Sequence, residues 1–301
     1  MPEQVQRGFL NAQVLARLAV LPLHARFAML GNVSGRHRSP VRGSSLEFSS
    51  YRKYVPGDDP RRLDWRAYGR SDRNYIKEFE ADTNLRLCVV VDTSGSMGFA
   101  PHGPSKLDYA RQLAGTLAYL AARQGDAVGL YCAAEKFSKE IPPKRNAAHL
   151  RHVLDQLDAM KAAGETGLVD ALHIAAEQIP QRALIVIISD LFVEPALLRG
   201  CFQHLRFRKH DVAVFHLLEQ AELDFEFDRP VRFLDLESNA AILADPNIIV
   251  RQYKQSLEKY LAEMKQAVRD TAVDYHRTCI HENYDEVLAR FLLARMPKKS
   301  K

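Results

Sequence analysis

Residues 85–96 read LRLCVVVDTSGS, and this stretch decides the fold. Its run of valine and leucine is typical of a strand that is buried on both faces, as strands of a parallel sheet are. The run stops at Asp92, and Ser94 and Ser96 follow at alternate positions with Gly95 between them. Ligands of open α/β sheets bind outside the carboxyl ends of the strands. One carboxylate and two hydroxyls at such a point are hard oxygen ligands, which suit a small hard cation such as Mg²⁺.

The rest of the chain alternates apolar runs with amphipathic segments. This pattern predicts an α/β fold with a doubly wound, mainly parallel sheet, and right-handed crossovers place helices on both of its faces. Further strands are expected at 127–133, at a short edge segment 137–141 that Pro142 and Pro143 end, at 183–190, at 211–218 and, as the last strand, at 231–236. Helices are expected at 105–124, 147–160, 169–179, 195–207, 249–270 and 284–296.

Two later segments carry side-chain oxygens at a strand end or before a helix. Residues 183–190, ALIVIISD, repeat the opening pattern, because an apolar strand again ends at an acid, Asp190. Residues 164–168, GETGL, place Thr166 in a glycine-flanked loop directly before a predicted helix. By its position, Thr166 fits the N-cap of that helix.

Composition is that of a soluble globular protein. The 301 residues are 26% charged and 47% apolar, enough for one large domain or two small ones. The net charge of +5 comes from the N-terminal quarter, since residues 1–75 hold 13 lysines and arginines but only 6 acids. A solvated basic face is the commoner explanation for such an excess, and an acidic partner, a membrane surface or nucleic acid are the alternatives.

The cysteines and the first 30 residues bear on the cellular compartment of the protein. The four cysteines are far apart and form no C-x-x-C pair, which favours a reducing compartment; they are Cys88, Cys132, Cys201 and Cys279. Residues 14–23, VLARLAVLPL, are interrupted by Arg17 and Pro22 and are too short to span a membrane. We expect an amphipathic helix there, no transmembrane segment, and a cytoplasmic protein.

Residues 48–80 mix arginines with aromatic side chains. Such a mixture can bind nucleic acid, because arginine contacts phosphates and aromatic rings stack on bases. Interleaved acids would weaken a phosphate track; they are Asp58, Asp59 and Asp64. We therefore favour a structural role, with Tyr54 and Trp65 anchoring the segment, and expect no nucleic acid partner.

The order of residues before Asp92 resembles a bacterial family. The matching positions are Glu47-Phe48, Arg52-x-Tyr54, Gly57-Asp58, Arg61, Asp64-Trp65 and residues 76–80, IKEFE. Together with Asp92-x-Ser94-x-Ser96 they resemble the von Willebrand factor A-like family catalogued as domain of unknown function fifty-eight, over residues 30–295. The resemblance implies a Rossmann-type von Willebrand factor A-like domain at 82–296, an N-terminal extension at 1–81 that carries the signature, and a basic tail at 297–301.

The resemblance also implies a metal-ion-dependent adhesion site. Its ligands here would be Asp92, Ser94, Ser96, Thr166 and, through water, Asp190. The expected ion is Mg²⁺, with Ca²⁺ or Mn²⁺ as alternatives, and an Asp or Glu of a protein partner would complete its shell. Members of the family are thought to act with MoxR-type AAA+ ATPases in assembling or activating protein complexes, and many carry membrane helices.

An enzyme is the remaining alternative. An acid at a strand end beside hydroxyls also suits metal-dependent phosphoryl transfer, as in phosphatases of the haloacid dehalogenase type. Those enzymes need a second aspartate two residues later, where this chain has Ser94. His102 and His173 fit a loop or helix-surface role better than that of a base. We therefore predict a non-enzymatic, metal-ion-dependent protein-binding module.

Overall fold

The computed structural model describes residues 7–26, 47–55, 64, 65, 68, 75–80, 85–101, 103–133, 139–179, 182–225, 231–234, 236, 241–244 and 246–296. The chain divides into two compact units. The larger unit comprises Met1–Ala25 and Arg86–Lys301, and the smaller one comprises Arg26–Leu85. Each unit is described below by itself.

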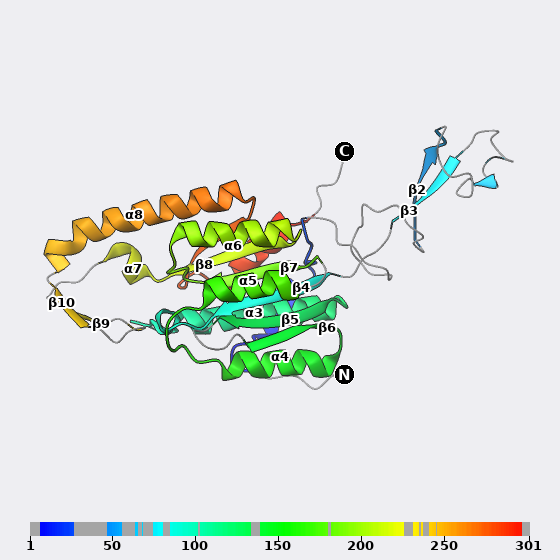
Figure 1. Ribbon diagram of the computed structural model, residues 1–301. Coiled ribbons are helices and arrows are strands. Elements are labelled where there is room, and N and C mark those ends of the chain that lie inside the picture. The colour runs from blue at the N-terminus through cyan, green and yellow to red at the C-terminus, as the bar shows by residue number, and fades with distance from the viewer. Residues whose placement is uncertain are drawn as a thin grey trace. The chain divides into compact units, whose positions relative to one another are not determined.

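A six-stranded sheet forms the centre of the larger unit (Figure 1). Every neighbouring pair is parallel except the pair at one edge. In spatial order the strands are β11 (Asp274–Cys279), β8 (Asp211–Leu218), β7 (Leu184–Ser189), β4 (Arg86–Asp92), β5 (Ala127–Ala133) and the antiparallel β6 (Lys139–Lys144). The predicted fold class, an α/β fold with a doubly wound, mainly parallel sheet, is confirmed.

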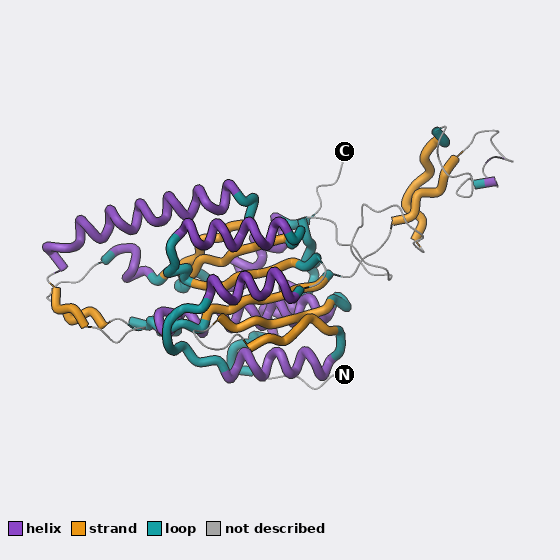
Figure 2. The backbone as a smooth tube through the Cα atoms, viewed as in Figure 1, coloured by secondary structure: helices purple, strands orange, loops and turns teal. Residues whose placement is uncertain are grey.

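One face of the sheet is covered by three helices, α5 (Leu168–Gln178), α6 (Pro195–Phe207) and α8 (Pro246–Asp270). Alternate residues of β4 point to this face, and Cys88 and Val90 belong to the buried cluster that these helices complete. Figure 2 shows helices on both sides of the strands. Burying one valine or leucine side chain contributes about 1.5–3 kcal/mol, so a sheet covered on both faces gains most of its stability here.

The other face is covered by α3 (Lys106–Arg123), with α4 (Ala147–Ala159), α9 (Tyr284–Ala294) and α1 (Ala12–Leu18) packed around it. Ser105 caps α3 and forms a capping box with Asp108, which satisfies the first free N–H groups of the helix. Gly115 of α3 has no side chain where Phe9 packs, and a Cβ there would lie 2.5 Å from the Phe9 ring. The segment before the sheet is thereby held on α3.

The N-terminal segment therefore belongs with the sheet. The sequence predicts one extension over residues 1–81, whereas the two compact units divide the chain at residues 25 and 85. The expected amphipathic helix is α1, and its buried residue is Leu18. No helix within the described ranges has both the length and the apolar character needed to cross a bilayer.

The edge strand corrects one prediction. We expected Pro142 and Pro143 to end a strand at 137–141, but β6 is Lys139–Lys144 and contains both prolines. A proline is tolerated in an edge strand because it lacks only an N–H, and the register of β6 is irregular at this point. Gly129 of β5 allows the close approach, since a Cβ there would lie 2.8 Å from the carbonyl oxygen of Ile141.

The final strand corrects another prediction. We expected the last strand at 231–236, but β9 (Val231–Leu234) pairs only with β10 (Ala241–Ala244), in an antiparallel hairpin separate from the sheet. The last strand of the sheet is β11, whose sequence DYHRTC has no apolar run. A half-exposed edge strand needs none, so apolar periodicity did not reveal it.

The smaller unit contains one antiparallel pair, β2 (Glu47–Lys53) and β3 (Tyr75–Glu80). Trp65 packs edge-on against Tyr68, with 6.3 Å between ring centroids, and 65% of Trp65 is exposed. Nearly half of the predicted basic and aromatic segment lies outside the described residues, as does the whole of the predicted tail at 297–301. The nucleic acid alternative for this segment stays a prediction.

Candidate metal site

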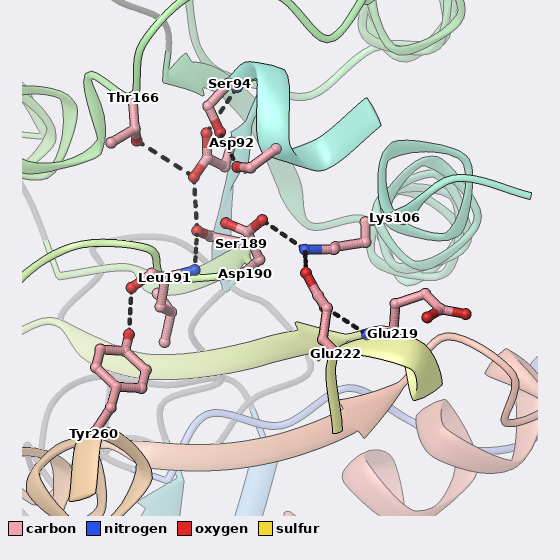
Figure 3. Close-up of polar contacts among 11 residues, drawn as sticks. Asp92, Ser94, Lys106, Thr166, Ser189, Asp190, Leu191, Glu219, Glu222 and Tyr260 are labelled. Carbon is pink, nitrogen blue, oxygen red and sulfur yellow. Dashed lines mark hydrogen bonds and ion pairs between the residues drawn. The ribbon is translucent and has the colours of Figure 1, made fainter. Parts of the chain in front are cut away.

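Asp92 is the last residue of β4, and its side chain is buried at the carboxyl end of the sheet (Figure 3). Its Oδ1 accepts a hydrogen bond from the Ser94 N–H at 2.9 Å. Its Oδ2 accepts one from the Ser189 hydroxyl at 2.7 Å. Both carboxylate oxygens are thus held in fixed directions by the ends of two adjacent strands.

The two serines of the opening motif lie side by side. Ser94 precedes the 3₁₀ helix η2 (Gly95–Gly98), and the hydroxyl oxygens of Ser94 and Ser96 are 3.0 Å apart. The N–H of Gly95 donates to the carbonyl oxygen of Gly164 at 2.9 Å, which ties this turn to the loop before α5. Two hydroxyl oxygens are therefore presented together next to Asp92.

Thr166 lies in that loop and faces Asp92. Its hydroxyl is 3.5 Å from Asp92 Oδ2, at the limit of a hydrogen bond, and it accepts from the N–H of Leu168 at 3.3 Å. The N-cap residue of α5 is Gly167, which provides no side-chain cap. Thr166 thus contacts both the helix start and the carboxylate of the site.

Asp190 directly follows β7, and its carboxylate lies between Asp92 and Lys106 (Figure 3). Its Oδ2 accepts a hydrogen bond from the Lys106 ammonium at 2.8 Å. Its Oδ1 is buried, and no group of the described residues donates a hydrogen bond to it. A buried carboxylate oxygen without a partner is unfavourable, so this atom points to a ligand.

Lys106 is the first residue of α3, and its side chain is completely buried. The ammonium also donates to Glu222 Oε1 at 2.6 Å. The rings of Phe99 and Phe192 lie 5.8 and 5.1 Å from the nitrogen. Glu222 belongs to α7 (Gln220–Asp224), so one ammonium joins the end of β7 to a short helix that precedes the β9–β10 hairpin.

The electrostatics of the site favour a bound cation. Burial, with the charge of Asp190 next in size, raises the pKa of Asp92 to about 6, although hydrogen bonds from Ser189 and Ser94 oppose the shift. Burial alone would lower the pKa of Lys106, but Asp190 and Glu222 outweigh it and the pKa is raised. The ammonium therefore stays charged, while the ionised form of Asp92 is destabilised.

The turn after Asp190 is held in an uncommon conformation. Leu191 has φ +56°, the left-handed region that non-glycine residues rarely adopt and that costs of order 1–3 kcal/mol. Ser189 Oγ accepts from the Leu191 N–H at 2.7 Å, and Tyr260 of α8 donates to the Leu191 carbonyl oxygen. These bonds stabilise the turn that aims Asp190 at Asp92.

The residues present fit a divalent cation. The Lys106 ammonium contacts Asp190 and Glu222, and the charge of Asp190 acts on Asp92. When ionised, these three carboxylates and the one ammonium leave two uncompensated negative charges. Buried charges are generally paired or coordinate a metal. Within the described ranges no three His, Cys, Asp or Glu residues are grouped to hold a metal, so an ion here must also use hydroxyl oxygens. Carboxylate and hydroxyl oxygens are ligands that Mg²⁺ accepts.

The five residues that sequence reasoning selected are placed as follows. Direct contacts bring together Asp92, Ser94, Ser96 and Thr166. Asp190 acts on Asp92 through its charge. Their role as metal ligands stays a prediction. Sequence reasoning missed the residues that support them, which are Lys106, Ser189, Leu191, Glu222 and Tyr260. Only Ser189 had a signal, its place beside the acid at a strand end.

The histidines considered as bases stand apart from these contacts. His173 lies on α5, and its Nδ1 is 2.9 Å from Nδ1 of His204 on α6. His204 is bonded in turn to Glu177 at 2.8 Å. His102 lies outside the described residues. The hydrogen bonds of His173 and His204 therefore join helices α5 and α6.

Comparisons with known proteins identify relatives of this sequence. The family model described as "Protein of unknown function DUF58" matches residues 50–263. An uncharacterized protein of Mycobacterium tuberculosis (strain H37Rv) is 26% identical over 242 residues, which is 79% of this chain and 75% of that protein. A solved aerotolerance-related membrane protein from Bacteroides fragilis is 17% identical, with a TM-score of 0.47, over 71% of this chain and all of that one. The VWA domain of SpRpn10 is 11% identical, with a TM-score of 0.42, over 69% of this chain and 95% of that one.

Proposed function

We propose that this chain, which belongs to the DUF58 family of proteins of unknown function, is a protein-binding module that holds its partner through a divalent cation. The observation that carries the proposal is the buried, unpartnered Oδ1 of Asp190 beside the buried carboxylate of Asp92. The Lys106 ammonium contacts only one oxygen of Asp190, so these two buried acids would be stabilised further by a divalent cation.

The ligand set suits capture of an external carboxylate. Asp92, Ser94, Ser96 and Thr166 would hold Mg²⁺, with Asp190 acting on it through water. The hydroxyls bring no charge, so the bound ion would remain able to attract an anionic group. Mg²⁺ prefers near-octahedral geometry and retains exchangeable waters. An Asp or Glu of the partner is the expected group. The ion would act as a Lewis acid that binds this carboxylate.

The proposal includes the partner class that the family resemblance implies. A MoxR-type AAA+ ATPase is the expected partner, with assembly or activation of other protein complexes as the outcome. A non-enzymatic role is part of the same proposal. It is supported by the serine at position 94, because phosphoryl transfer of the haloacid dehalogenase type needs an aspartate there.

Thermal unfolding in EDTA, Mg²⁺, Ca²⁺ or Mn²⁺ tests the metal site. A ligand that binds only the folded state raises the melting temperature by mass action. We expect a rise for the parent protein and none for Asp92→Ala. Asp158→Ala is the matched control, because Asp158 is an exposed acid on α4 and its loss should leave the metal response intact.

A pull-down with a MoxR-type ATPase, with and without EDTA, tests the partner. Capture that EDTA and Asp92→Ala both abolish would support a metal-bridged contact. Equal capture in EDTA would contradict the proposal, as would a parent protein whose melting temperature ignores all three cations.

A further inference from the structure

We infer that Lys106 sets the affinity of the metal site. Its fixed positive charge weakens the binding of a divalent ion, and the negative charge of Glu222 partly cancels this effect. This inference rests on the proposed metal-dependent function. It assigns a role to two residues that are not themselves expected metal ligands.

The first support is the placement of the ammonium. Lys106 has no exposed surface, and its nitrogen lies 2.8 Å from Asp190 Oδ2 and 2.6 Å from Glu222 Oε1. The rings of Phe99 and Phe192 flank it. In this apolar setting its positive charge is poorly screened and acts on the neighbouring site with more strength than in water.

The second support is the charge of the cluster. With Lys106 in place, a divalent ion exactly balances Asp190, Asp92 and Glu222, so the loaded site is neutral. Without the ammonium the loaded site would keep one negative charge and would repel a partner's carboxylate. Lys106 therefore weakens metal binding but favours an anionic ligand once the metal is bound.

The third support is the way Glu222 is held. Its Oε2 accepts from the Glu219 N–H at 2.8 Å, which completes the capping box of α7. Its carbonyl oxygen accepts from Tyr253 of α8 at 2.8 Å. Glu222 thus keeps a fixed position against Lys106, and its negative charge partly cancels the effect of the ammonium on the site.

A purely structural role makes a different prediction. If Lys106 and Glu222 only joined α3 to α7, removing either one would loosen the site and weaken metal binding. Charge tuning predicts opposite effects, because one variant removes a repelling charge and the other removes an attracting charge.

Calorimetric titration of the full chain with Mg²⁺ at pH 8 separates these roles. We expect Lys106→Met to bind Mg²⁺ at least about tenfold more tightly than the parent, and Glu222→Gln about threefold or more weakly. Lys265→Met and Glu263→Gln make the same changes on the exposed surface of α8 and should leave the affinity unchanged. Lys106→Gln removes the charge but keeps a donor for Asp190, so it should shift the affinity in the same direction as Lys106→Met.

Any result other than these expected shifts in Mg²⁺ affinity would overturn the inference. Weaker binding by both Lys106→Gln and Glu222→Gln would mean that the pair is structural, and the proposed function would stand. If the lysine variants do not fold, Glu222→Gln decides alone. Unchanged or tighter Mg²⁺ binding by this variant would overturn the charge-tuning role and leave the proposed function standing. A parent that binds no Mg²⁺ would remove the proposed function and this inference together.

Discussion

Each end of the six-stranded sheet carries a buried cluster of opposite charges, and the two clusters are built differently. At the carboxyl ends of the strands, Lys106 contacts Asp190 and Glu222. At the amino ends, Arg295 contacts Asp211, the first residue of β8, at 2.7 Å and Asp274, the first residue of β11, at 3.0 Å.

The cation makes the difference. The guanidinium of Arg295 donates to both aspartates and also to the carbonyl oxygen of His24, so one group closes the cluster and holds the N-terminal segment. His276 contacts the remaining oxygen of Asp274 at 3.0 Å. The ammonium of Lys106 reaches one oxygen of Asp190 and leaves the other without a donor. A planar guanidinium thus joins several groups at once in a structural cluster, although its Nη2 has no hydrogen-bond partner among the described residues. The ammonium instead leaves an acceptor, Asp190 Oδ1, without a donor.

The largest effect should come from opening the closed cluster. Arg295→Met leaves Asp211 and Asp274 buried without their cation, and we expect unfolding free energy to fall by about 3–5 kcal/mol. Urea denaturation measures this. Arg199→Met, at a half-exposed ion pair with Asp270, should change it by less than about 1 kcal/mol. A loss of similar size in both variants would contradict the distinction.

Neutralising one aspartate in each cluster should have opposite effects. Because the pKa of Asp92 is raised to about 6 by burial and Asp190, ionised Asp92 destabilises the metal-free fold above that pH and not below its unfolded value. At pH 7.5 in EDTA we expect Asp92→Asn to add on the order of 1–2 kcal/mol and Asp211→Asn to remove a similar amount. Chemical denaturation of both variants decides this, and a destabilised Asp92→Asn would show that the open cluster is also structural.

An effect of similar size to these substitutions concerns pH at the amino end. His210 is buried before β8, and burial, with the charge of Arg208 next, lowers its pKa to about 4. Between pH 6.5 and 4 the unfolded chain therefore binds a proton that the folded protein does not, and stability falls by roughly 2 kcal/mol. His210→Asn keeps an acceptor for the Ala183 N–H, which donates to Nδ1 at 3.2 Å. The unfolding free energy of this variant should fall less than that of the parent protein between pH 7 and 4.5. An equal fall in both would contradict the assignment of this pH dependence to His210.

The sheet and its helices could be predicted because their signals are local. The strands that end at Asp92 and Asp190 are continuous apolar runs, and the helix limits follow from caps such as Ser105. The five proposed ligands also have local signals, since each lies at a strand end or near a helix start, but their assignment as a set rests on the family resemblance. The polar strand β11 and the prolines of β6 were misjudged because edge positions relax the rules that apolar runs and proline normally follow.

The support of the site could not be predicted in this way. Lys106 is one of many lysines, and a lysine after an N-cap is expected in solvent. Its burial depends on Glu222, which is 116 positions away in the sequence. Leu191 likewise has no sequence feature that indicates a left-handed turn, because one of the bonds that hold this turn comes from Tyr260, 69 positions away. Contacts of this kind exist only once the chain has folded.

The prolines of β6 affect the self-association of this protein at high concentration. An unprotected sheet edge presents a row of N–H and C=O groups to which a foreign strand can add, and such addition starts aggregation. Pro142 and Pro143 have no N–H to offer an added strand, and the register of β6 is irregular at this point. The sheet is therefore terminated on this side, so that crowding favours contacts through side chains over growth by strand addition.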